Sequence, residues 1–259
     1  MVLVNNQFLR YLNSRMKMQM TIKFTLAVSA LSLLAACGGG GSSESTSSNS
    51  STGVATDAEI RQLITDSNIL AHDPTNPAAG TVRWVGINNL PPQIPVYIPS
   101  PTNATESDYA AKVRVAIADT NRKTGGRISL SEVSAIPTSG GYLRTSYLTA
   151  YVPQGSTDYA SYCANVSTGP NVGNVVQADS FTNNYNNVVA WVNLGNGFCN
   201  VTQEIVTHEL GHALGLRGHF TGFGYGNAIS SAYWDVLATL YGNPLRTIAA
   251  QLTIYRSSP

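Results

Sequence analysis

Residues 208–220 read HELGHALGLRGHF, and this stretch decides which fold and which chemistry the chain is expected to have. It opens with His-Glu-x-x-His and reaches a third histidine, His219, near its end. On a helix, side chains four residues apart share a face, so His208 and His212 can present their imidazoles to one metal ion. Glu209 points about 100° around the same helix and can reach a metal-bound water without being a ligand.

Composition does not explain this pattern. With 4 histidines and 6 glutamates among 259 residues, a shuffled chain would contain His-Glu-x-x-His with a chance of roughly 0.1%. Imidazole is a preferred zinc ligand, and zinc lowers the pKa of a bound water towards about 7. The sequence therefore predicts zinc as the cofactor and Glu209 as the general base that takes the proton of the water.

The third protein ligand needs a separate argument. Catalytic zinc sites normally use three protein ligands and one water. His219 follows Gly215 and Gly218, whose backbones let the chain fold back beneath the helix, and we expect His219 to be the third ligand. Asp235, the one acidic residue downstream of the motif, is the alternative.

Residues 208–219 resemble the active-site helix of the metzincin clan of zinc metallopeptidases, which has the pattern H-E-x-x-H-x-x-G-x-x-H. Four positions match in place: His208, Glu209, His212 and Gly215. Residues 113–133 and 230–242 are more weakly similar to a helix, a strand and the C-terminal helix of matrixin-like domains. The resemblance implies a zincin-like fold and a peptide substrate that lies extended along the edge strand before residues 188–194.

The chain departs from the clan at two points. Gly218 stands where the clan has its third histidine, and His219 comes one residue later. The clan also carries a methionine turn beneath the metal, but the last methionine of this chain is Met20. Ile229 or a neighbour is expected to supply the apolar floor instead.

The hydrophobic pattern outside the motif predicts an α+β fold, in which helices pack against a mixed, twisted β-sheet. Thr56 and Glu59 have the spacing of a capping box, and Gly215 is the expected stop of the active-site helix. Helices are expected at 57–66, 107–122, 202–214 (or from 200) and 230–241, and strands at 81–87, 96–98, 127–133, 142–152, 175–178 and 188–194.

The N-terminal residues predict export. Residues 1–36 have the features of a signal peptide, with the true start possible at Met18 or Met20. The sequence LAAC ending at Cys37 resembles the lipobox of bacterial lipoproteins, in which the cysteine is lipidated; the alternative is an ordinary secretory signal with an incidental cysteine. Residues 37–53 would then consist of the lipidated cysteine and a Gly/Ser linker. A pre-domain segment, 54–79, and a catalytic domain, 80–259, are expected to follow.

Lipidation at Cys37 would anchor the protein in the bacterial cell envelope, at the outer membrane if the cell is Gram-negative, or at the cell surface. Loss of residues 1–36 removes four basic and no acidic residues, which changes the net charge from +1 to −3 and argues against a nucleic-acid partner. Cys163 and Cys199 are then the one possible disulfide pair of the exported chain, with two buried thiols as the alternative.

Three further residues are weaker candidates for the site. His72 is expected on a surface loop, within a segment that could be an inhibitory prosegment. Tyr225 and Tyr233 could stabilise an oxyanion, although core packing suits Tyr233 better.

These features together predict an exported, lipid-anchored zinc endopeptidase. One alternative is a non-catalytic zinc-binding surface module on a peptidase scaffold, and another is a zinc hydrolase of cell-wall amides.

Overall fold

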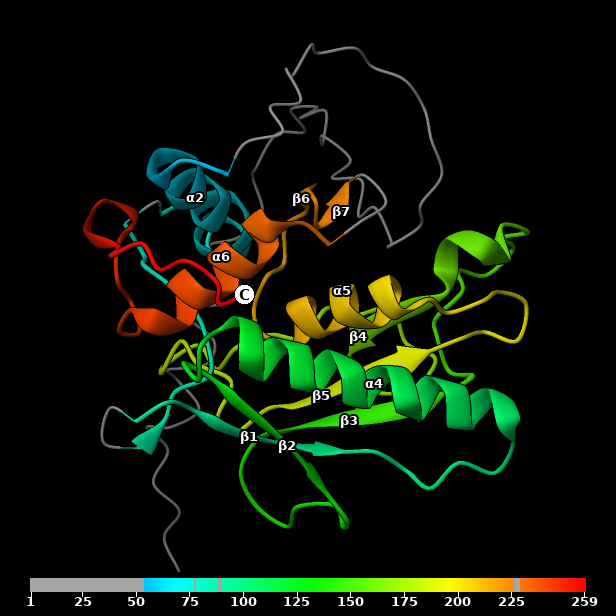
Figure 1. The fold of residues 1–259 in the computed structure, drawn as a ribbon. Coiled ribbons are helices and arrows are strands. Elements are labelled where there is room, and N and C mark those ends of the chain that lie inside the picture. The colour runs from blue at the N-terminus through cyan, green and yellow to red at the C-terminus, as the bar shows by residue number, and fades with distance from the viewer. Residues whose placement is uncertain (1–53, 77, 88–89, 226–228) are drawn as a thin grey trace, which may run out of the picture. The chain divides into compact units, whose positions relative to one another are not determined.

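Five strands form a mixed sheet in the order β2-β1-β3-β5-β4 in the computed structural model, which describes residues 54–259 except 77, 88–89 and 226–228 (Figure 1). The strands are β1 (Gln93–Tyr97), β2 (Ser129–Val133), β3 (Tyr142–Tyr147), β4 (Ala164–Ser167) and β5 (Val189–Leu194). Neighbouring strands from β2 to β5 run parallel, whereas β4 pairs antiparallel with β5. A mostly parallel sheet with several helices is compatible with the predicted α+β class.

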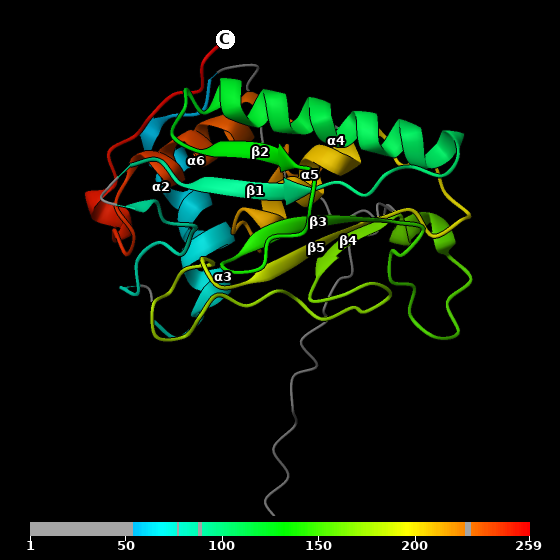
Figure 2. The ribbon, with the colours of Figure 1, turned by 90° about the horizontal axis from the view of Figure 1, so that it is seen from below.

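Helices α4 and α5 pack against each other on one face of this sheet (Figures 1 and 2). The helical elements are α2 (Asp57–Ile64), the π-helical turn η1 (Thr65–Ile69), α3 (Leu70–His72), α4 (Ala104–Lys123), η3 (Tyr159–Tyr162), α5 (Gln203–Ala213), α6 (Ser231–Gly242) and η4 (Ala249–Gln251). Local sequence explains where they begin: Thr56 and Glu59 form the predicted capping box, and the Ser230 hydroxyl caps α6.

The N-terminal helices belong to the core of the molecule. Ile60, Ile64 and Ile69 have no exposed side-chain surface and lie in one hydrophobic cluster with Leu143 of β3 and Val236 of α6. Residues 54–79 therefore share the core of residues 80–259.

Two of the expected strands are wrong. Residues 81–87 make one isolated bridge, at Arg83, because side chains take the ladder positions: Asn68 bonds both backbone groups of Val82, and Asn186 bonds those of Val85. Residues 175–178 have no regular structure.

The edge strand β4 lies in a stretch where no strand is expected. The strand expected at 142–152 ends at Tyr147, because Leu148 adopts a φ of 57° that a strand cannot continue.

Three sequence-based predictions concern residues 1–53. The signal peptide, Cys37 and the linker lie outside the described residues. Within residues 54–259, as far as the structure describes them, no helix is both long and apolar enough to cross a membrane.

Candidate metal centre

Helix α5 carries the motif and ends where the sequence predicts. The Thr202 hydroxyl accepts a hydrogen bond from the Ile205 amide, 3.2 Å away, at the N-terminus of the helix. At the other end Gly215 has a φ of +104°, and the Leu216 amide donates to the Gly211 carbonyl over 3.1 Å. This is a Schellman motif, which turns the chain sharply at the predicted glycine.

Aromatic donors fix α5 to the rest of the domain. The indole Nε1 of Trp84 donates to the carbonyl of Ala213 (2.9 Å), and the hydroxyl of Tyr241 donates to that of Leu214 (2.8 Å). The hydroxyl of fully buried Tyr233 donates to the Thr207 carbonyl over 3.1 Å, so Tyr233 has the packing role that the sequence favoured.

The three motif histidines converge. Nε2 of His212 lies 3.0 Å from Nε2 of His208 and 3.1 Å from Nε2 of His219. Tetrahedral zinc with bonds of about 2.0–2.1 Å holds its nitrogen ligands about 3.3 Å apart, so the spacing suits such an ion. These histidines could hold a metal ion, since one candidate ligand atom from each lies within 4.8 Å of the others.

Asp235, the alternative third ligand, is used elsewhere. Its Oδ1 accepts from the Ser257 amide (2.7 Å) and its Oδ2 accepts from the Arg256 guanidinium (2.9 Å). The carboxylate therefore fastens the C-terminal tail to α6. It is not part of the histidine cluster.

The cluster is suited to metal binding in its protonation as well. Burial, with neighbouring imidazoles as a second cause, lowers the pKa of His208 to about 2 and that of His212 to about 4, and burial lowers the pKa of His219. Neutral imidazoles have a lone pair to give to a metal ion. Because the Leu216 carbonyl can only accept, Nδ1 of His212 donates to it (2.5 Å), which leaves Nε2 as the atom that could bind a metal ion.

Phe223 forms the apolar floor beneath the cluster. Its ring centroid lies 4.5 Å from that of His208, 5.0 Å from that of His212 and 5.9 Å from that of His219. The same ring stacks on Tyr233 at 5.2 Å. Ile229 or a neighbour was expected to supply this floor, and the residue that does so is Phe223, six positions before Ile229.

Two glycines give Phe223 and the histidines their room. A Cβ on Gly211 would stand 2.6 Å from the Phe223 ring. A Cβ on Gly224 would stand 2.4 Å from the His219 ring and 2.9 Å from the His208 ring. Gly224 belongs to β7 (Gly224–Tyr225), which pairs with β6 (Phe220–Thr221), so this short pair holds its backbone against the imidazoles. The side chain of Tyr225 lies outside the described part of the structure.

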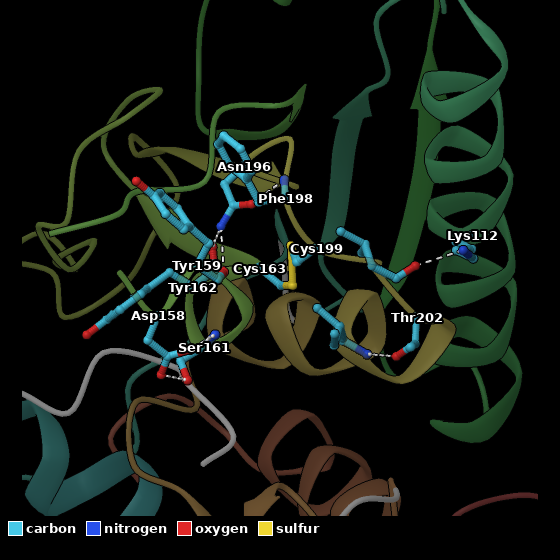
Figure 3. The surroundings of a disulfide bond; sticks show 12 residues. Lys112, Asp158, Tyr159, Ser161, Tyr162, Cys163, Asn196, Phe198, Cys199 and Thr202 are labelled. Carbon is cyan, nitrogen blue, oxygen red and sulfur yellow. Dashed lines mark hydrogen bonds between the residues drawn. A yellow bond between two sulfur atoms is a disulfide. The ribbon is translucent and has the colours of Figure 1, made fainter. Parts of the chain in front are cut away.

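The predicted disulfide joins Cys163 to Cys199 and is confirmed (Figure 3). Cys163 immediately precedes β4, and Cys199 lies on the loop that enters α5, so the bond ties the edge strand to the start of the motif helix. Beside it, the Asn196 amide donates to the carbonyls of Tyr159 (2.7 Å) and Tyr162 (2.9 Å).

His72 is not the surface-loop residue that the sequence suggests. It ends α3, is half-buried, and places Nε2 3.1 Å from both the Gly215 carbonyl and the Tyr185 hydroxyl. Sequence spacing gave no signal for this contact, because 143 residues separate His72 from Gly215.

Glu209 lies next to His208 on α5 and is 2% exposed.

No protein-family model matches the chain, and no curated protein matches its sequence.

Proposed function

We propose that the chain is a zinc-dependent endopeptidase with a zincin-like fold and a metzincin-type, matrixin-like site. The observation that carries this proposal is the convergence of three imidazoles on one point, with Glu209 beside the first of them on the same helix.

The donor set fits zinc. His208, His212 and His219 would hold the ion through nitrogen atoms, and three protein ligands leave the fourth position for water, as in catalytic sites. A structural site would normally be closed by a fourth protein ligand and would have no use for a carboxylate base. Zinc, when bound, supplies acidity to a coordinated water and polarises the substrate carbonyl.

Glu209 is the proposed general base. It accepts the proton of the attacking water and passes it to the amine that leaves when the peptide bond breaks. Burial of the carboxylate excludes competing bulk water from this transfer.

The proposed substrate is a peptide in extended conformation. Strand β4 is the last strand of the sheet on the β5 side, and it contacts α5. A peptide that pairs with an edge strand gains main-chain hydrogen bonds, and β4 would direct such a peptide past the histidine cluster.

The proposed location is the bacterial cell envelope, with a lipid on Cys37 as the anchor. Cell fractionation tests this part separately. The wild type should require detergent for extraction, and Cys37→Ser should be released or remain unprocessed. A wild type that is soluble without detergent would exclude the anchor.

The function is tested by purifying the chain from residue 38 onward, measuring zinc per chain, and assaying casein cleavage with and without a chelator. Bound zinc and chelator-sensitive cleavage are expected. Zinc without cleavage would favour the non-catalytic module, and cleavage of cell-wall amides in place of casein would favour the amide hydrolase.

A further inference from the structure

The turn between α5 and His219, residues 215–218, is held by the N-terminal π-helical turn η1. Asn68 of η1 is fully buried, and its Nδ2 donates to the carbonyl of Gly215 (2.8 Å) and to that of Val82 (2.7 Å). Its Oδ1 accepts from the Val82 amide over 2.9 Å. One side chain therefore joins the end of the motif helix to a segment 147 residues earlier in the chain.

The main chain of η1 makes a second connection to the same turn. The Ser67 carbonyl accepts hydrogen bonds from the amides of Arg217 (2.7 Å) and Gly218 (3.0 Å). Gly218 is in close contact with η1, since a Cβ there would stand 3.0 Å from both the Asp66 carbonyl oxygen and the Ser67 Cα. His72 adds a further hydrogen bond to the Gly215 carbonyl.

Two of the metal-site histidines depend on this turn. Its Leu216 carbonyl orients the ring of His212, and its last residue, Gly218, leads directly into His219. A shift of the turn would therefore move both imidazoles.

We propose that η1 is a positioning element of the metal site, with Asn68 as its principal residue. The segment 65–72 is then a permanent part of the site and not a removable inhibitory prosegment. Removal of segment 65–72 would therefore weaken metal binding instead of activating the protein. The inference rests on the proposed function for the presence of the metal, but not for peptide hydrolysis.

The test compares Asn68→Ala with Ile60→Ala in the full chain extracted from expressing cells. Ile60 is equally buried in the same N-terminal segment, but it does not bond the 215–218 turn. Zinc affinity is measured by competition with a chromophoric chelator, the coordination by the visible spectrum of the Co²⁺-substituted protein, and stability by thermal unfolding of the metal-free form.

We expect Asn68→Ala to weaken zinc binding about 10–100-fold and to alter the cobalt spectrum, as changes behind a metal ligand do. Ile60→Ala should lower the unfolding temperature but leave zinc affinity within about twofold. Gly218→Ala, whose Cβ would press on the main chain of η1, should resemble Asn68→Ala and replaces it if that variant does not fold.

Equal zinc affinities for wild type, Asn68→Ala and Gly218→Ala would overturn the inference, as would an equal loss in Ile60→Ala. A wild type that binds neither zinc nor cobalt would contradict the proposed function, and the inference with it. A wild type that binds zinc without cleaving casein leaves this comparison fully decisive.

Discussion

The Nε2 atoms of His212 and His219 lie 3.1 Å apart, although a helix end and a turn separate the two residues. The late position of His219 in the motif therefore does not keep its side chain away from the other histidines. The Schellman motif at Gly215 reverses the chain, and the turn that follows packs against Asp66 and Ser67 at Gly218. The residue that delays His219 by one position therefore lies in a turn that is hydrogen-bonded to Ser67, and Nε2 of His219 still reaches the cluster.

Gly224→Ala should disturb the metal site in a way that Gly155→Ala does not. Both glycines have a positive φ, +86° and +82°, so either alanine should cost about 1–2 kcal/mol of backbone strain. A Cβ on Gly155 meets nothing within 4 Å, whereas one on Gly224 collides with the rings of His219 and His208. Zinc titration of both variants should show at least about tenfold weaker binding for Gly224→Ala alone. Similar zinc affinities in the two variants would mean that β7 does not constrain the imidazoles.

Glu209→Gln should retain zinc and lose hydrolysis. The amide keeps the size of the side chain but cannot accept the proton of the attacking water, and a general base contributes about 10²–10⁴-fold to the rate. The measurement is kcat/KM on a peptide substrate together with zinc per chain. A variant with full zinc content and activity within about tenfold of wild type would remove Glu209 from the mechanism.

His72 should make the stability of the metal-free protein depend on pH. Burial is the main cause that lowers its pKa from 6.5 to about 4. The unfolded chain then binds the proton more readily, so the contribution of His72 is complete above about pH 6.5 and is lost as the pH falls towards 4. Each pKa unit corresponds to about 1.4 kcal/mol.

Urea unfolding at pH 7 and pH 5 checks this expectation. From pH 7 to pH 5, the unfolding free energy of His72→Gln should fall less than that of the wild type. The other buried histidines are present in both proteins, so the difference between the two losses reports His72. The same loss in both proteins would show that His72 is not held neutral by the fold.

Replacement of Cys163 and Cys199 together by alanine should lower the unfolding free energy. The disulfide spans 36 residues, and a cross-link of such a loop contributes about 2–4 kcal/mol through the entropy of the unfolded chain. Denaturant unfolding of the oxidised wild type, the reduced wild type and the double variant measures the difference. The reduced wild type and the double variant should have similar unfolding free energies. An oxidised wild type that is no more stable than these two forms would contradict the expectation.

The sequence predicts the parts of the fold and site that depend on local spacing. The Thr56–Glu59 capping box and the Gly215 stop involve residues a few positions apart, so the pattern identifies them directly. The i, i+4 pair in α5 is predictable for the same reason. The sequence also predicts that His219 joins the other two histidines, because the glycines that precede it let the chain turn back.

Other parts depend on distant partners and have no local signal. Strand β4 contains Asn165 and Ser167, and it is a strand because β5 pairs with it. Asn68 reads as an ordinary polar residue, yet the fold buries it between Val82 and Gly215. Phe223 lies in a glycine-rich stretch, and nothing local indicates that its ring will lie beneath three histidines.

The most direct test of the account is the zinc affinity of His219→Ala compared with that of Asp235→Asn. Asp235 is the right control because its carboxylate holds the Ser257 amide and the Arg256 side chain instead of the cluster. Changes behind a metal ligand lower the metal affinity about 10–100-fold, and His219→Ala should lower the zinc affinity by more than that. Asp235→Asn should keep wild-type zinc affinity with a lower unfolding temperature. If His219→Ala binds zinc as tightly as the wild type while Asp235→Asn releases it, the three-histidine site is contradicted.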